Sequence, residues 1–187
     1  MTKAIGFDVF DTAIGHCGIA WSATAIAGTR LPESTIEDIQ RRWSEAKLLP
    51  PPPFVHDAMT RIRRHLAGEP DDLLSLPLDE ADVPDLYRRI YAYTRAIPPG
   101  ETRTYGEVAK AMGDPLLARA VGQAMGRNPW PIIVPCHRVL AAGGKTGGFS
   151  APGGVDTKFK ILVIEQAHMK QADSLFDSLP LAVKPHS

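Results

Sequence analysis

Short apolar stretches separated by glycine and polar residues open the chain. Three of them have the length of strands and lie close together, at residues 4–7, 17–21 and 24–27. Short apolar runs bounded by turn-forming residues are typical of buried strands. The pattern therefore predicts three strands joined as a small antiparallel meander.

Helical spacing follows these strands. Apolar residues three or four positions apart predict a helix over 32–47, which the proline run at 50–53 ends, and a second helix over 55–67. Residues 68–82 are acidic and contain two prolines, so we interpret them as a linker with a short extended segment. A domain boundary is expected near 80–84.

The second part of the chain is mostly helical by pattern. An apolar face over 86–97 predicts one helix. Thr104 and Glu107 have the spacing of a capping box, in which each side chain accepts from a backbone N–H of the other residue. Asp114 followed by Pro115 then begins another helix. Two short helices joined by a tight turn are typical of a helix-turn-helix.

The second helix of this pair has two unlike faces when its residues are placed at about 100° intervals. The apolar residues that share the inward face are Leu117, Val121, Ala124 and Met125. The opposite face carries Arg119, Gly122 and Gly126. Because a glycine inside a helix costs roughly 1 kcal/mol relative to alanine, two on one face indicate that another backbone approaches closely. That backbone belongs either to DNA or to a second helix of the protein.

Composition limits the class of protein. A chain of 187 residues with 44% hydrophobic and 22% charged residues can bury a core of ordinary size. We find no apolar run long enough to cross a bilayer and no secretory leader, so a cytoplasmic protein is expected. The two cysteines, Cys17 and Cys136, do not have the spacing of a disulfide framework.

The net charge of zero conceals an asymmetry. Residues 1–82 hold 8 Lys and Arg against 13 Asp and Glu, a net charge of −5, whereas residues 83–170 hold 12 against 6, a net charge of +6. Residues 171–187 hold 1 against 2 and form the predicted tail. A basic part beside an acidic part is typical of a protein in which only one part meets phosphate groups.

Reactive chemistry is concentrated where Cys136 is followed directly by His137. The preceding residues 132–134 predict a buried strand. The thiolate is the reactive form of cysteine, and a histidine within reach, directly or through a water, can take the thiol proton. Such a histidine needs a third group to orient it. Glu165 is the best candidate, because it lies on an apolar helix where an unpaired carboxylate is costly.

Other interpretations of these residues stay open at this point. Cys136 can be a small buried apolar residue, and His137 a core histidine bonded to the backbone. A cysteine hydrolase that uses Cys136, His137 and Glu165 would turn over esters or amides. Zinc binding is disfavoured, because the sequence has no CxxC or HxxxH spacing.

A glycine-rich loop follows the cysteine. Residues 143–154 hold six glycines in twelve residues. The GxxxxGK[ST] spacing of a phosphate-binding loop is absent. Such a loop is suited to surrounding a substrate closely with backbone N–H groups.

Taken in order, these segments resemble the O6-alkylguanine-DNA alkyltransferases, also called methylated-DNA–protein-cysteine methyltransferases. The resemblance runs from about 83 to 167. The segments that carry it are 97–102, 104–109, 119–122, 128–129, 135–139 and the glycine-rich loop. Residues 1–82 match only loosely, as is typical of the family's variable N-terminal domain.

The resemblance implies an α+β fold with two domains. Residues 1–82 would form an N-terminal support domain, ribonuclease H-like, with a small antiparallel sheet, helices and the linker. Residues 83–170 would form a mostly helical, winged helix-turn-helix-like domain that binds DNA and carries the active-site cysteine.

The resemblance also implies a role for each matching residue. Cys136 would be the alkyl acceptor, His137 its base through a water, and Glu165 the residue that orients the histidine. Asn128 would steady the turn of the active site. Tyr105 would face the flipped guanine and the neighbouring phosphate.

The remaining implied contacts are with DNA. Arg119 would fill the gap left by the extruded base, the carbonyls of Cys136 and Val139 would accept from the guanine amino group, and the Ser150 N–H would donate to O6. The other residues expected at the DNA or the base are Thr104, Gly122, Gln123, Gly126, Arg138 and Phe149.

The implied reaction is a single displacement on duplex DNA. The helix-turn-helix would enter the minor groove, the alkylated guanine would be rotated out of the stack, and the thiolate would take the alkyl group irreversibly. O6-alkylguanine and O4-alkylthymine are the expected substrates. The protein would act once, as a monomer, without a cofactor and without a membrane, at the nucleoid if the source is bacterial.

Two departures from the family's pattern leave details open. Phe149 stands where many members carry tyrosine, and the loop is longer than in many, so the range of accepted alkyl groups is undetermined. Ligands matching the structural zinc of the family's human member are not apparent. The alternative function is that of a sensor that binds the lesion without repairing it, but such proteins lack the acceptor that Cys136 supplies.

Overall fold

The first three strands follow one another as a meander, as the sequence predicts. β1 (Gly6–Thr12) pairs antiparallel with β2 (Gly15–Trp21), which pairs antiparallel with β3 (Ile26–Arg30). The hairpin requires glycine at position 15, because its φ is 124° and a Cβ there would lie 2.8 Å from the Cβ of Pro32. The computed structural model describes residues 4–32, 35–142 and 154–166 of the chain.

The sheet gains a fourth strand that the sequence did not predict. α1 (Ile36–Arg42) begins with a capping box between Thr35 and Asp38. The chain then returns as β4 (Lys47–Leu48), which pairs parallel with β1. The predicted helix over 32–47 is therefore wrong at its C-terminal end, and the predicted antiparallel sheet is mixed, in the order β3-β2-β1-β4.

The false helical spacing has a physical cause. Trp43 and Ala46, beyond the end of α1, pack against the same small cluster as α1 itself, made of Phe7, Ala20 and Ile39. The ring centroids of Trp43 and Phe7 lie 6.1 Å apart. Trp43 and Ala46 are thus spaced like residues of a helix because they pack on the same face of the sheet as α1, although the chain turns at this point.

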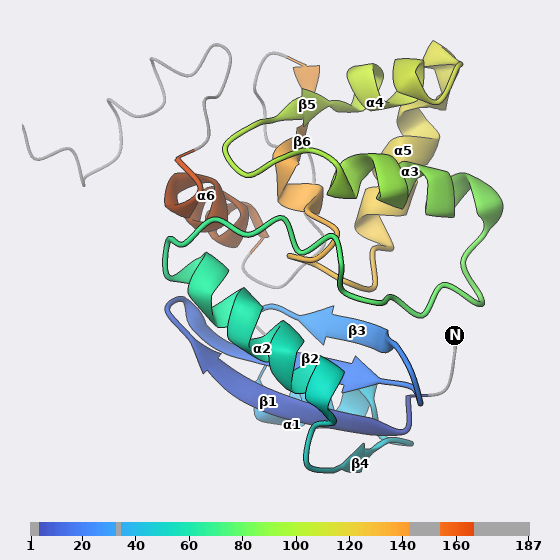
Figure 1. Cartoon of the computed structure of the whole chain (residues 1–187). Coiled ribbons are helices and arrows are strands. Elements are labelled where there is room, and N and C mark those ends of the chain that lie inside the picture. The colour runs from blue at the N-terminus through green and yellow to red at the C-terminus, as the bar shows by residue number, and fades with distance from the viewer. Residues whose placement is uncertain (1–3, 33–34, 143–153, 167–187) are drawn as a thin grey trace, which may run out of the picture.

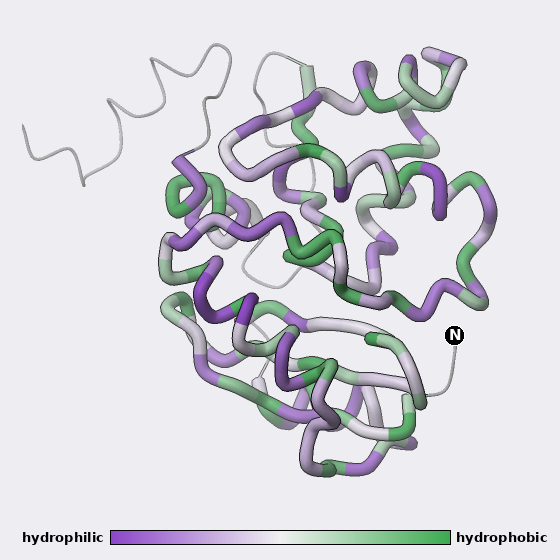
Figure 2. The backbone as a smooth tube through the Cα atoms, in the orientation of Figure 1, coloured by the Kyte–Doolittle hydropathy of each residue, from purple (hydrophilic) through white to green (hydrophobic). Residues whose placement is uncertain are grey.

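The other face of the sheet is covered by α2 (Pro53–Leu66), which confirms the second predicted helix (Figure 1). The helix begins with a proline at its first turn, where a missing N–H costs nothing. Hydrophilic and hydrophobic residues alternate along it (Figure 2). Its buried residues are Val55, Ala58, Met59, Ile62, His65 and Leu66. The sheet is therefore the middle layer between α1 and α2.

The segment predicted as a linker packs against both parts of the protein. Leu73 and Leu76 are buried, and Leu78 forms a bridge with Ile26 at the start of β3. From the following helix, the Arg95 guanidinium donates to three backbone carbonyls of this segment. The connection is therefore fixed to both parts of the protein.

The second part holds the predicted helix pair. After α3 (Asp85–Arg95), Thr104 and Glu107 form both hydrogen bonds of the capping box at the start of α4 (Tyr105–Ala111). Asp114 then caps a 3-10 turn, η1 (Pro115–Leu117), which continues into α5 (Ala118–Gly126).

None of the helices in the described part of the chain has the length and apolar character needed to cross a membrane.

The segment before the cysteine is a buried turn, so the strand predicted at 132–134 is wrong. Its residues are buried, but Ile132 has a φ of 79°, and only an isolated bridge joins Pro131 and Val134. Prolines at 129, 131 and 135 lack the N–H groups that a strand ladder needs.

Three short elements complete the second part. η2 (Cys136–Arg138) leads into β6 (Val139–Leu140), which pairs parallel with β5 (Arg103–Thr104). α6 (Gly154–Ile164) then lies beside both η2 and the end of α2 (Figure 1). The cysteine-bearing turn is thus held by a strand pair on one side and a helix on the other.

The edge strand β3 holds the turn that precedes the cysteine. The Thr29 N–H donates to the Pro129 carbonyl at 2.9 Å, and its hydroxyl donates to the Pro131 carbonyl at 2.7 Å. The Trp130 indole Nε1 donates to the Ile26 carbonyl at 2.7 Å. One hydrophobic cluster extends from the sheet to α6. The N-terminal sheet therefore positions a segment of the second part.

We expect Trp130→Phe to lower the free energy of unfolding by about 1–3 kcal/mol, because the Ile26 carbonyl loses its buried donor. Urea denaturation measures the change. Trp43→Phe is the control, because the half-buried Trp43 makes no indole hydrogen bond in the described part of the chain. Equal losses in the two variants would show that the hydrogen bond contributes nothing beyond ring size.

Candidate active site

Cys136 is held in place by the turn that precedes it. The thiol residue is 5% exposed and begins η2, and its N–H donates to the Val134 carbonyl. The Asn128 side chain spans the same turn: its Nδ2 donates to the Val134 carbonyl at 2.8 Å, and its Oδ1 accepts from the Trp130 N–H at 2.9 Å. Asn128 thus fixes both ends of the turn that presents the thiol.

Two opposing influences act on the thiol. Burial raises the pKa of Cys136, because it disfavours the charged thiolate. A hydrogen bond from Asn128 and the positive charge of Lys158 lower it in part. The site therefore contains both the thiol and groups that stabilise its thiolate.

Lys158 is a functional candidate that sequence reasoning missed. It lies on α6, is 1% exposed, and its Nζ donates to the Val139 carbonyl at 2.7 Å. Burial lowers the pKa of its ammonium group to about 8, against the opposite influence of Cys136. A charged residue on an apolar helix was the pattern that pointed to Glu165. Lys158 shows the same pattern and could have been found by the same argument.

Glu165 follows the last residue of α6 and is buried. Its Oε1 lies 2.9 Å from Nε2 of His137 and 2.7 Å from an Nη of Arg138, whose Nε donates to Oε2 at 3.0 Å. Oε1 also lies 2.9 Å from Nε2 of His65. The structure therefore brings His137 and Glu165 together, and adds two partners, His65 and Arg138.

The protonation pattern follows from these contacts. Burial alone would raise the pKa of the Glu165 carboxyl, but its contacts with His137, His65 and Arg138 outweigh burial and hold that pKa well below its usual range. Burial lowers the pKa of His137 despite the carboxylate beside it. At neutral pH we assign a neutral imidazole whose Nε2–H donates to Glu165. Its Nδ1 then carries the lone pair that can accept a proton.

Arg138 does not lie where the resemblance suggested. Its side chain is 2% exposed, and its guanidinium bonds Glu165 and the Ile97 carbonyl. The expected contact of this side chain with DNA is therefore corrected: together with His137 and His65, the guanidinium keeps Glu165 ionised. Val139 is buried as well, and its carbonyl already accepts from Lys158.

Tyr105 and Thr104 lie at the start of α4. Thr104 is the helix cap, and Tyr105 is half-buried. Burial raises the pKa of the Tyr105 hydroxyl, and the neighbouring Cys136 adds to the shift. The tyrosine is therefore close enough to the cysteine to interact with it electrostatically. Phe149 and Ser150 lie outside the described residues.

The two faces of α5 are as the sequence predicts. Val121, Ala124 and Met125 are buried, and Leu117 is partly buried. On the opposite face the exposed residues are Arg119, Gln123 and Gly126. A Cβ added at Gly122 would meet no atom of the described chain within 4 Å. Packing of a second helix against Gly122 is thus excluded within that part, and the space is open for another molecule.

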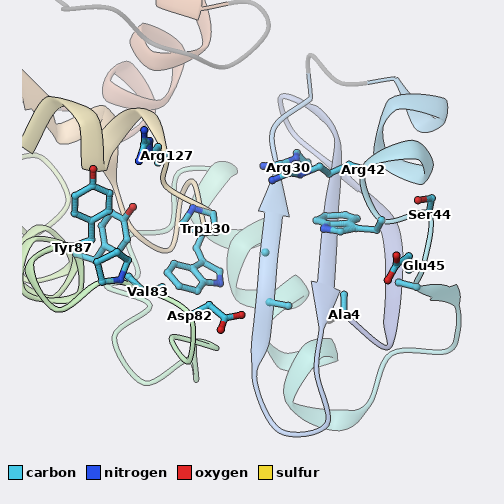
Figure 3. A pocket seen from close by; sticks show the side chains of 17 residues that line it. Ala4, Arg30, Arg42, Ser44, Glu45, Asp82, Val83, Tyr87, Arg127 and Trp130 are labelled. Atoms are coloured by element: carbon cyan, nitrogen blue, oxygen red, sulfur yellow. The ribbon is translucent and has the colours of Figure 1, made fainter. Parts of the chain in front are cut away.

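A cavity of about 620 Å³ lies away from the cysteine, between the sheet and α3 (Figure 3). One wall carries Arg30 and Arg42, and the other carries Tyr87, Arg127 and Trp130. Cys136 does not line this cavity, so it is not the place of the chemistry.

Residues 4–32, 35–142 and 154–166 contain no group of three or more histidine, cysteine or acidic side chains placed to hold a metal ion.

Comparison with known proteins agrees with the geometry. The family model for the DNA-binding domain of 6-O-methylguanine DNA methyltransferase matches residues 85–167. The methylated-DNA–protein-cysteine methyltransferase of Mycolicibacterium paratuberculosis is 35% identical over 173 residues, which cover 92% of this chain and 99% of that protein.

Solved structures are similar over the same extent. Mycobacterium tuberculosis OGT in complex with DNA superposes with a TM-score of 0.72 at 33% identity, covering 87% of this chain and 93% of that one. The O6-methylguanine-DNA methyltransferase of Pyrococcus kodakaraensis gives a TM-score of 0.65 at 26% identity, covering 86% of this chain and 98% of that one. The likeness therefore includes the N-terminal sheet, where the sequence resemblance was weak.

We expect Lys158→Met to move the pH midpoint of Cys136 alkylation by iodoacetamide upward by about one unit, because the thiolate loses a nearby positive charge. The measurement is made in a Cys17→Ala background, so that one thiol reacts. Lys160→Met, at an exposed position on the same helix, is the control and should leave the midpoint unchanged. An unchanged midpoint for Lys158→Met would remove the lysine from the site.

Proposed function

The chain belongs to the methylated-DNA–protein-cysteine methyltransferase family, and we propose that it repairs alkylated DNA by moving the alkyl group from guanine O6, and from thymine O4, onto Cys136. The observation that carries the proposal is a buried cysteine followed directly in sequence by a buried histidine that Glu165 orients. This arrangement supplies a nucleophile, a proton acceptor and a group that stabilises the protonated imidazole.

The reaction proceeds in one displacement. The Cys136 thiol gives its proton to Nδ1 of His137 through a bridging water, and Glu165 stabilises the resulting imidazolium. The thiolate sulfur then bonds to the alkyl carbon as the bond between that carbon and O6 breaks, and the electron pair passes to the guanine ring. Tyr105 donates a proton at N3 of the leaving base, which improves the leaving group.

The product explains why each chain acts once. A thioether has no proton to lose and resists cleavage, and the reaction consumes the thiol that performs it. No cofactor takes part, because the alkyl group itself moves from base to protein. The protein is therefore a stoichiometric reagent, methylated-DNA–[protein]-cysteine S-methyltransferase, that acts as a monomer on duplex DNA.

The exposed face of α5 is the proposed DNA contact. Arg119 would enter the gap left by the rotated guanine, while Gly122, Gln123 and Gly126 would allow the helix to approach the minor groove closely. The open space above Gly122 supports this orientation. A related protein from Mycobacterium tuberculosis has been crystallised in complex with DNA.

The finer description of the fold also belongs to the proposal. We interpret α4, η1 and α5 as a helix-turn-helix within a winged DNA-binding domain over 83–170, and the sheet with α1 and α2 as a ribonuclease H-like support domain over 1–82. The tail predicted at 171–187 lies outside the described residues. The contacts assigned to Phe149 and Ser150 at the base remain predictions from the resemblance.

We expect intact-mass measurement after incubation with O6-methylguanine DNA to show a gain of one methylene per chain. Cys136→Ala should show no gain, because the acceptor sulfur is absent. Cys17→Ala, which removes the other buried cysteine, is the control and should gain the methylene as the unaltered chain does. Binding of methylated DNA with no mass gain in the unaltered chain would instead establish the alternative, a lesion sensor.

We expect Gly122→Ala to raise the free energy of unfolding by up to about 1 kcal/mol while weakening the binding of duplex DNA. The added methyl group fills open space in the protein, so it stabilises the helix, but it blocks close approach of the minor groove. Reaction with free O6-benzylguanine is the control and should be unchanged. Unaltered DNA affinity would place the DNA on a different face.

A further inference from the structure

Glu165 has a partner that the proposed mechanism does not use. His65 lies in the last turn of α2, far from the cysteine in sequence and in the part of the chain assigned to the support domain. Its side chain is 1% exposed, and its Nε2 lies 2.9 Å from Oε1 of Glu165. The same oxygen contacts Nε2 of His137. One carboxylate oxygen therefore joins a histidine of the first part to a histidine of the second.

The hydrogen-bond roles of His65 are fixed by its other nitrogen. The Asp71 N–H donates to Nδ1 at 3.2 Å, so Nδ1 is an acceptor and Nε2 carries the proton. His65 consequently donates to Glu165. The Asp71 carboxylate is itself held by the Arg61 guanidinium at 2.6 and 2.8 Å. The ring orientation of His65 is thus set by α2 and the segment directly after it.

Glu165 needs an anchor outside its own helix. It follows Ile164, the last residue of α6, and the next residue, Gln166, has a φ of 52°, which no helix continues. The helix therefore ends at Glu165, whose own N–H still donates to the Ile161 carbonyl. Beyond the helix, Arg138 from η2 and His65 from α2 both bond Oε1, the oxygen that orients His137, and His65 does so from the other part of the chain.

We propose that His65 is a positioning residue for alkyl transfer. By donating to Oε1 of Glu165, it holds the carboxylate in the orientation in which His137 presents Nδ1 toward the thiol. The inference rests on the proposed function of Cys136. It assigns the N-terminal part a direct share in setting the reaction rate, in addition to supporting the fold. His65 touches neither substrate nor thiol, and acts only through Glu165.

Two substitutions separate the two hydrogen bonds of His65. His65→Asn keeps an acceptor near the Asp71 N–H but is too short to reach Glu165. His65→Gln can extend an amide N–H toward Oε1. Thr94→Val is the matched control for a lost buried hydrogen bond, because the Thr94 hydroxyl donates to the Ile90 carbonyl and has no contact with Glu165.

Single-turnover transfer from saturating O6-methylguanine duplex gives two separate quantities: the fraction of chains that take the methyl group and the rate constant of those chains. We expect His65→Asn to lower the rate constant about tenfold, because the carboxylate loses a donor, while the active fraction stays high. His65→Gln should recover most of the rate, and Thr94→Val should retain all of it.

A purely structural role would give a different result. The active fraction and the melting temperature of His65→Asn would fall while the rate constant of the active chains stayed at the unaltered value, and this would overturn the inference. Equal rate constants for the Asn and Gln variants would overturn it as well. If the unaltered chain takes no methyl group, the proposed function itself fails, and the two failures are thereby distinguished.

Discussion

The arrangement of this protein depends on the hydrogen bonds and charges that satisfy the buried carboxylate of Glu165. An ionised carboxylate is costly to bury unless every lone pair is satisfied by a donor or a charge. Here three residues from two elements supply the donors: His65 on α2, and His137 and Arg138 on η2 beside the cysteine. Removing any one of them leaves part of the charge unpaired in a medium of low polarity. The requirement therefore ties α2, α6 and the cysteine-bearing turn into one unit.

The position of the thiol depends on a second set of contacts, which are hydrogen bonds to backbone groups rather than ion pairs. The turn before Cys136 is rich in proline and has few N–H groups of its own. Asn128 donates to the Val134 carbonyl from within the turn, and Thr29 on the sheet edge donates to the Pro131 carbonyl. In the other direction, the Trp130 indole donates from the turn to the Ile26 carbonyl of β3. The N-terminal part thus stabilises the active site twice, through β3 at the turn and through α2 at Glu165. A cysteine that is only 5% exposed can react only with a group that reaches it past the residues that cover it. This suits a base that has been rotated out of the helix.

The face of α5 proposed to contact DNA carries little charge and few side chains. A chain with zero net charge does not attract phosphate as a whole, and the excess of positive charge is confined to the second part. On α5 the buried residues hold the helix to the core, while two glycines, Gln123 and Arg119 occupy the other side. The glycines would allow close approach of DNA, and Arg119 is the charged side chain proposed to fill a vacated stack. The segments proposed for the chemistry and for DNA contact therefore lie in successive elements of the second part.

The sequence by itself determined the local elements: the strand meander, the capped helix pair, the two faces of α5, and the pairing of His137 with Glu165. These follow from spacing and from the cost of burying a charge, both of which are readable along the chain. Tertiary structure alone decided the rest. The parallel strand β4, the buried turn at 132–134, the burial of Arg138 and the arrival of His65 at Glu165 all depend on contacts between distant segments. Apolar spacing reports that a residue is buried, but the partner it is buried against is fixed only when the layers pack.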